Sequence, residues 1–270
     1  MCEKRLEEAL KIKTPDWTLK DVRYAVKSLN SGISKDPYEY PNEIFKVGVA
    51  GEGLLKAITI LINKLKQNPS DYPAAMELCN VTTIYKNKGD KRDFNSYRGV
   101  FRTTSLRNIM DHLIYIDEYQ KVDDSLTDCN VGSRKHRNIR DNLFVMNAIM
   151  NASRKENENA CDIMVYDVKK CFDSLWLSEC NNDLFEAGVN NDKLCLLYYS
   201  NKNARIAVKT PSGVSKRFTI NNTVMQGTVW AGLKCTGTMD KLGKQAYGDP
   251  NLLYRYKTWL IYHRSRWLMT

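Results

Sequence analysis

A short apolar segment that ends in an acidic residue is the feature that most constrains this chain. The apolar run 163–165 predicts a β-strand, Asp167 stands at its end, and Phe172 follows five positions later. Nucleotidyl transfer with two metal ions needs a carboxylate on a rigid strand end, where it can hold Mg²⁺ against a triphosphate. The alternative is structural, with a strand that runs into a helix through a turn rich in aspartate.

The chain is basic and has the composition of a folded protein. Of its 270 residues, 43% are hydrophobic and 10% aromatic, which indicates a globular fold rather than a disordered chain. Its net charge is +10 and its isoelectric point is near 9.1, which suits a polyanionic partner such as nucleic acid. A basic protein without such a partner is the alternative.

Neither a membrane span nor a secretion signal is expected. No uninterrupted apolar run approaches the roughly 20 residues of a membrane span, and residues 1–10 lack the apolar region of a signal peptide. The eight cysteines show no Cys-x-x-Cys spacing, and the three histidines form no pair with zinc-ligand spacing. These features predict an intracellular protein, cytoplasmic, nuclear or both, with reduced thiols and no membrane partner.

The hydrophobic periodicity predicts a helix-rich α+β fold. Helices are expected at 3–12, 18–30, 42–47, 53–67, 104–120, 138–154, 175–188, 191–201 and 229–246. Strands are expected at 76–85, 98–102, 163–165, 204–209 and 214–220. Thr18 and Asp21 have the spacing of a capping box, which predicts the start of the second helix. After residue 252 no clear period remains.

Four segments occur in an order that resembles the reverse transcriptases of non-long-terminal-repeat retrotransposons. They are residues 95–100 (Asn-Ser-Tyr-Arg-Gly-Val), 128–144, 167–173 and 225–228 (Met-Gln-Gly-Thr). The resemblance extends from about Trp17 to about Lys257. It implies an RNA-directed DNA polymerase, a nucleotidyltransferase encoded by a transposable element, whose partners are an RNA template, a DNA primer and deoxynucleotides.

The resemblance also implies a right-hand polymerase fold with part of the hand missing. N-terminal helices and fingers are expected over 1–160, a partial palm over 161–250 and an aberrant tail over 251–270, with the thumb absent.

Three residues would hold the metal and the triphosphate. By resemblance, Asp167 is the catalytic residue and the Mg²⁺ ligand, while Lys86 and Arg98 bind the triphosphate. Arginine offers a planar fork to phosphate oxygens and lysine a compact charge, as phosphoryl transfer requires. The alternative for both cations is a solvated basic turn.

Three more residues would contact the nucleotide itself. Phe172 matches the family position that reads the sugar, where its ring excludes a ribose 2′-hydroxyl; the alternative is an ordinary core aromatic. Gln226 would hydrogen-bond the nucleotide or template, and Gly227 would let the backbone approach closely.

A block of cations would contact nucleic-acid phosphates. Its members are Arg134, Lys135, Arg137 and Arg140. The alternative is a solvated loop and helix start.

Three departures from the family pattern are tolerable, and a fourth removes the chemistry. Gly232 stands where proline is usual, Cys171 where alanine is usual and Ser133 where an aromatic residue is common. The Asp-Asp pair of motif C, which supplies the partner carboxylates, is missing after Asp173. Mg²⁺ is therefore expected for the intact parent, whereas this chain should bind it weakly or not at all and should be inactive.

The end of the chain is interpreted as a shifted reading frame. Similarity to the family stops after Lys257, and one choice of codons for 266–270 reads Met-Val-Asp-Asp after a one-base shift. The alternative is the arbitrary tail of a truncated gene.

Three functions compete. The first is an inactive fragment of a reverse transcriptase, and the second is a remnant that still binds RNA or an RNA–DNA hybrid. The third is a non-functional pseudogene product, whose palm sheet would lack its central hairpin and expose a strand edge. The sequence leaves the oligomeric state open.

Overall fold

The chain folds into a helix-rich α+β protein. A computed structural model describes residues 3–46, 51–155, 163–168, 170–210, 213–220, 222–247, 253–256 and 259–263. The α-helices are α1 (Glu3–Lys11), α2 (Leu19–Ser28), α3 (Glu43–Lys46), α4 (Gly51–Gln67), α5 (Ser105–Ser125), α6 (Ile139–Lys155), α7 (Cys171–Ser174), α8 (Leu177–Glu186), α9 (Asp192–Lys202) and α10 (Ala231–Tyr247). The α+β class and most of the predicted elements are confirmed.

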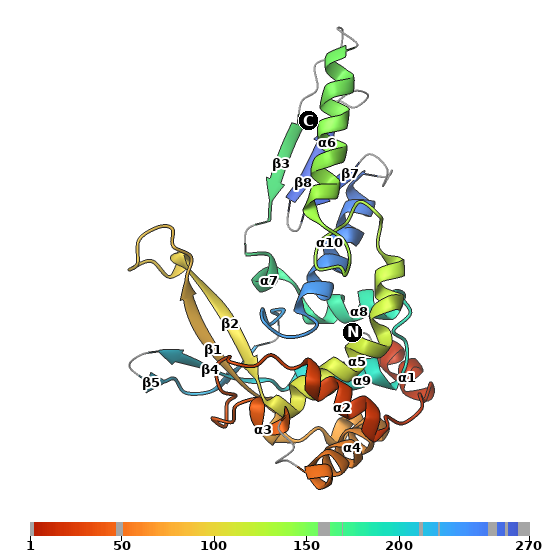
Figure 1. Cartoon of the computed structure of the whole chain (residues 1–270), viewed down its shortest axis with the longest axis vertical. Coiled ribbons are helices and arrows are strands. Elements are labelled where there is room, and N and C mark those ends of the chain that lie inside the picture. The colour runs from red at the N-terminus through yellow and green to blue at the C-terminus, as the bar shows by residue number, and fades with distance from the viewer. Residues whose placement is uncertain are drawn as a thin grey trace.

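The strands form two sheets. They are β1 (Leu78–Tyr85), β2 (Tyr97–Thr103), β3 (Ile163–Asp167), β4 (Arg205–Thr210), β5 (Gly213–Val214), β6 (Phe218–Thr219), β7 (Leu253–Tyr256) and β8 (Trp259–His263). The first sheet has the order β2-β1-β4-β5, with β6 also paired to β4, and the second has the order β3-β8-β7. Figure 1 shows the β1–β2 hairpin projecting from the helical body and the second sheet beside α6.

The first sheet joins distant parts of the chain. β1 and β2, which correspond to the strands predicted at 76–85 and 98–102, form an antiparallel hairpin in which Val81 pairs with Phe101. β4 pairs with β1 in parallel, so that Val81 also pairs with Val208. The predicted boundary at residue 160 therefore does not separate two sheets, because a strand of the expected palm completes the sheet of the expected fingers.

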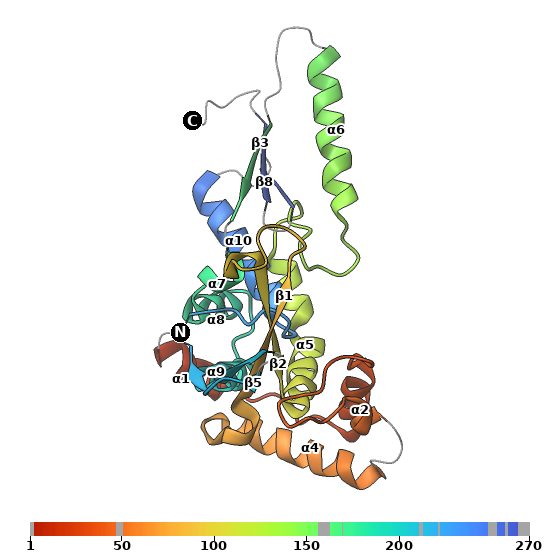
Figure 2. The same cartoon turned by 90° about the vertical axis from the view of Figure 1, so that its left-hand side faces the viewer.

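The second sheet differs from the sequence prediction. Residues 252–270 have no clear period, yet β7 and β8 pair antiparallel with each other, and β8 pairs with β3. The sequence predicted that the palm sheet would lack its central hairpin. This prediction is wrong for the backbone, because the antiparallel strands β7 and β8 lie in the same sheet as β3. Strand pairing satisfies main-chain donors and acceptors whatever the side chains are, so an irregular pattern does not prevent it. Figure 2 shows α6 standing alongside this sheet.

Local sequence signals account for the start of α2. The side chain of Thr18 accepts a hydrogen bond from the backbone N–H of Asp21, and the Asp21 carboxylate accepts one from the N–H of Thr18. This capping box, which the sequence predicted, satisfies backbone donors that the first helical turn leaves unpaired. Val22, Ala25 and Val26 then face the core.

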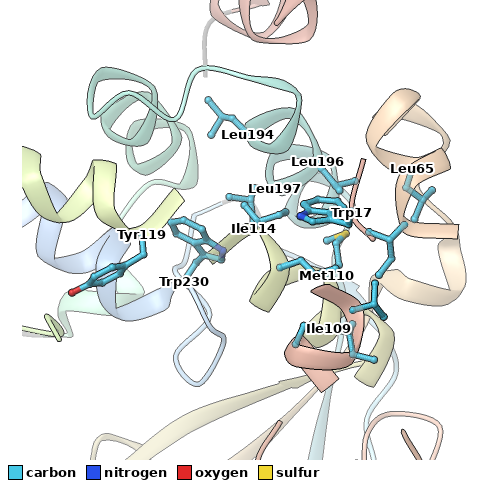
Figure 3. Packing of buried hydrophobic residues seen from close by; sticks show 14 of the residues in the cluster. Trp17, Leu65, Ile109, Met110, Ile114, Tyr119, Leu194, Leu196, Leu197 and Trp230 are labelled. Atoms are coloured by element: carbon cyan, nitrogen blue, oxygen red, sulfur yellow. The ribbon is translucent and has the colours of Figure 1, made fainter. Parts of the chain in front are cut away.

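One main hydrophobic core holds the helical body together. Figure 3 shows Ile114 and Leu197, which come from α5 and α9, near Trp230, which lies just before α10. The indole N–H of Trp230 donates to the carbonyl of Asp111 at 3.2 Å, so its polar end is satisfied inside the core. The ring of Tyr115 meets Trp230 edge-on with 5.5 Å between centroids. This core also contains residues from both sides of the predicted boundary at residue 160.

None of the helices in the described ranges is both long and apolar enough to cross a membrane.

Candidate functional site

Three of the four segments that the sequence singled out meet around the loop before α10. The carbonyl of Phe172, in α7, accepts a hydrogen bond from the N–H of Val224 at 3.0 Å. Two residues later, the carbonyl of Gln226 accepts one from the N–H of Phe101 in β2 at 2.7 Å. We call residues 222–228 the bridging loop, because its backbone connects α7 to β2.

Gly227 is required where the bridging loop meets β2. Its φ is +105°, which favours glycine, and a Cβ there would lie 2.9 Å from the Phe101 carbonyl oxygen and 3.0 Å from Cγ1 of Val100. The sequence predicted a close backbone approach at Gly227. In the structure, the backbone of Gly227 lies close to strand β2 of the same chain.

Phe172 is half-buried rather than fully exposed or fully enclosed. Its ring packs against a small buried cluster. The buried members are Cys171, Leu175, Leu177, Cys180, Val224, Ala231 and Cys235. The packing gives Phe172 a part in the core and holds it beside the bridging loop.

Lys86 and Arg98 lie on the β1–β2 hairpin, and both are exposed. The Lys86 ammonium donates to the carbonyl of Asn95 at 2.8 Å, which fixes it near the hairpin tip. Arg98 lies in β2 opposite Ile84. No carboxylate among the described residues forms an ion pair with the Arg98 guanidinium. Its charge is therefore exposed to solvent.

The tip of the hairpin is crossed by hydrogen bonds and carries an exposed ring that the sequence prediction missed. The hydroxyl of Tyr85 donates to the Gly89 carbonyl at 2.7 Å, and that of Tyr97 donates to the Lys91 carbonyl at 2.9 Å. Phe94 is 90% exposed. The signal that could have identified Phe94 is an aromatic residue inside a cationic turn. Stacking on bases needs an exposed ring beside positive charge.

Arg134 is a structural residue, which corrects its predicted role as a phosphate contact. Its Nε donates to Oδ1 of Asp123 at 2.8 Å, and its side chain is only 4% exposed. It also donates to the carbonyls of Thr127 and Asn130 at 2.9 and 3.0 Å. The Arg134 guanidinium lowers the pKa of the Asp123 carboxyl, and the pair fastens the 127–134 loop to the end of α5.

The other three cations of this block remain at the surface. The Lys135 ammonium lies 4.3 Å from the centroid of the Tyr119 ring, a cation–π contact. Arg137 pairs with the exposed Asp128 at 2.7 Å, and Arg140 is exposed at the start of α6. These side chains are accessible to a polyanion.

Two of the departures from the family pattern pack against each other. A Cβ on Gly232 would lie 2.7 Å from Oγ and 2.9 Å from Cβ of Ser133. Ser133 itself has a φ of +56°, in the left-handed region. The absence of a side chain at 232 therefore makes room for the turn that contains Ser133.

A cluster of buried charged side chains lies next to the bridging loop. Arg107 donates to Oδ1 of Asn201 at 2.8 Å and lies 3.7 Å from the Asp111 carboxylate. Together with Lys234 these side chains border a cavity of about 10 Å³ under the bridging loop. Burial raises the pKa of Asp111 and lowers the pKa of Lys234, because each ion loses its hydration.

The strands described beside Asp167 supply no second carboxylate for a pair of Mg²⁺ ions. Asp167 ends β3, and its side chain lies outside the part that the structure describes. Trp259 of β8 is the strand partner of Asp167, and neither β7 nor β8 contains an acidic residue. Among the described side chains, no group of three or more His, Cys, Asp or Glu is placed to hold a metal ion. Two divalent cations need more carboxylate charge than this sheet supplies.

No protein-family model matches this chain, and no curated protein matches it. The assignment of roles therefore rests on the motifs and on the geometry described above.

Substitution of Gly227 tests the contact between the bridging loop and β2. Gly227→Ala should lower the free energy of unfolding by about 1–3 kcal/mol, because alanine is strained at this φ and meets the Phe101 carbonyl. Chemical denaturation measures the change. Gly237→Ala is the matched control, since a Cβ there meets nothing within 4 Å and α10 gains a better helix former. Equal stability of the two variants would contradict the contact.

A double-mutant cycle tests the packing of Gly232 against Ser133. Gly232→Ala should destabilise the protein by about 1–3 kcal/mol, since the new methyl group overlaps Ser133. Ser133→Gly should be neutral or stabilising, because glycine suits a φ of +56°. The double variant should recover most of the loss, with a coupling energy of at least about 0.5 kcal/mol. Strictly additive effects in denaturation experiments would refute the contact.

Proposed function

We propose that this chain is a fragment of a retrotransposon reverse transcriptase that has lost metal-dependent catalysis. One observation carries the proposal: the bridging loop contacts both Phe172 and β2. Its Val224 N–H donates to the Phe172 carbonyl at 3.0 Å, and its Gln226 carbonyl accepts from the N–H of Phe101 in β2 at 2.7 Å. The resemblance assigns sugar reading, template contact and triphosphate binding to these same segments. Their convergence from three distant parts of the sequence is what such a nucleotide site requires.

The composition of the sheet that contains Asp167 supports the proposed inactivity. In the intact parent, Asp167 and further carboxylates would hold Mg²⁺, which would supply positive charge for phosphoryl transfer. Here neither β8, which pairs with β3, nor β7, which pairs with β8, contains a carboxylate, so the charge of the ions would be left poorly compensated. No step of nucleotide addition is therefore assigned to this chain.

Retained binding of nucleic acid is a second candidate function, and the hairpin tip favours it. The segment 85–98 carries five Lys or Arg and two Asp. The two carboxylates accept backbone hydrogen bonds within the turn, Asp90 from Arg92 at 2.8 Å and Asp93 from Asn95 at 2.9 Å. The cations and the ring of Phe94 therefore face solvent together, the combination that binds single strands. The expected partners are RNA or an RNA–DNA hybrid.

Primer extension tests the loss of catalysis. Purified protein, supplied with an RNA template, a DNA primer, deoxynucleotides and Mg²⁺, should extend no primer, because the second carboxylate set is missing. Asp167→Asn should give the same background. Template-directed extension that Asp167→Asn abolishes would refute the proposal, since it would demonstrate a working metal site.

Salt-dependent binding tests the hairpin tip as a nucleic-acid site. Arg98→Ala should weaken binding of a single-stranded oligonucleotide and reduce the slope of log K against log salt by about 0.7, since one phosphate contact is lost. Phe94→Ala should weaken binding about tenfold with little change of slope, since stacking is lost. Fluorescence anisotropy measures both quantities.

The matched controls for this experiment lie on α4. Lys56→Ala removes an exposed cation and Ile60→Ala removes an exposed apolar side chain, and neither should change binding. If all four variants lose affinity equally, binding is spread over the basic surface and the hairpin tip is not the site.

A further inference from the structure

Two buried cysteines from different helices lie in direct contact. Sγ of Cys171, at the start of α7, is 3.0 Å from Sγ of Cys235 in α10, although 64 positions separate them in the sequence. Cys171 is 4% exposed and Cys235 is 5% exposed. A further approach of about 1 Å would bring the two sulfurs to the length of a disulfide bond.

The surroundings distinguish this pair from the chain's other described thiols. Cys180 belongs to the same buried cluster, but its recorded partner is the hydroxyl of Thr238 at 3.5 Å. Cys79 and Cys195 contact backbone carbonyls, and the thiol of Cys129 donates to the hydroxyl of Thr127 at 3.4 Å. The short contact between Cys171 and Cys235 joins two sulfurs instead.

We propose that Cys171 and Cys235 are an oxidisable dithiol that closes to a disulfide and locks α7 onto α10. With hydrogen peroxide as the oxidant, one thiolate attacks a peroxide oxygen and becomes a sulfenic acid, and the other oxygen leaves and is protonated to water. The second sulfur then attacks the sulfenic sulfur and releases a second water. Two thiols lose two electrons and two protons in all, and the peroxide is reduced to two waters.

The environment sets the rate of this reaction. The hydrogen bond with Cys171 and burial both raise the pKa of the Cys235 thiol. Because the thiolate is the nucleophile, a raised pKa makes oxidation slow at neutral pH and faster at higher pH. The burial of both sulfurs also favours a small oxidant over a protein disulfide.

The position of the pair gives the disulfide a consequence for the candidate site. Cys171 directly precedes Phe172, whose carbonyl holds Val224 of the bridging loop. A disulfide at 171 would therefore fix α7 and the ring of Phe172 relative to α10. The dithiol is independent of the proposed function, whereas its effect on nucleotide or template binding rests on that function.

Peptide mapping after oxidation tests the proposal. The intact protein is treated with hydrogen peroxide, alkylated under denaturing conditions and digested with trypsin and a glutamate-specific protease. The second protease cleaves between Glu179 and Cys180, so it separates Cys171 from Cys180. A peptide linking Cys171 to Cys235 should appear after oxidation and disappear on reduction. The oxidised protein should also unfold at a temperature about 5–15 °C higher than the reduced protein.

Two variants complete the test. Cys180→Ser should keep both the linked peptide and the increase in unfolding temperature. Cys171→Ala, which introduces a small side chain at a buried site, should lose both. The proposal is overturned if both thiols are still alkylated after prolonged treatment with excess peroxide at raised pH. Linkage of Cys180 to Cys235 in equal yield would also overturn it. A linked peptide without any effect on oligonucleotide binding would leave the dithiol standing and contradict only its role at the candidate site.

Discussion

Two backbone hydrogen bonds of the bridging loop hold the candidate site together. One joins Val224 to Phe172 and the other joins Gln226 to Phe101, so the loop fixes α7 against the first sheet. Backbone groups must be paired when water is excluded, which makes such a contact independent of most side chains. Gly227 is the exception, because only glycine combines its φ with so close an approach to β2.

The positive charges of this protein divide into two groups that composition does not distinguish. Arg134 and Arg107 are buried and stabilise a loop and a helix through carboxylate and amide partners. Arg98, Arg137 and Arg140 are exposed and add to the surface field. A buried cation without a partner would be strongly destabilising, so the first group is tied to its neighbours. Only the second group can attract a polyanion.

The second sheet separates the requirements of folding from those of catalysis. β8 pairs with β3 and β7 pairs with β8, although neither strand brings an acidic residue beside Asp167. Strand pairing depends on main-chain geometry, whereas holding two Mg²⁺ ions depends on carboxylate number. The same backbone pairing can therefore form whether or not the strands carry the carboxylates of a metal site.

The sequence by itself determined the local structure. Hydrophobic period predicted most of the helices, β-branched and aromatic residues predicted the strands β1 and β2, and the Thr18–Asp21 spacing predicted the start of α2. These signals act between residues at most a few positions apart, so they can be read along the chain.

Only the tertiary structure decided which residues meet. The pairing of β1 with β4, the packing of Gly232 against Ser133 and the contact of Cys171 with Cys235 join segments far apart in the sequence. The tertiary structure also decided that the side chain of Arg134 is buried while its neighbours stay exposed. Residue type alone does not predict this difference. The physical reason is that burial and long-range contact depend on how whole elements pack, and the local pattern of one element does not specify its partner.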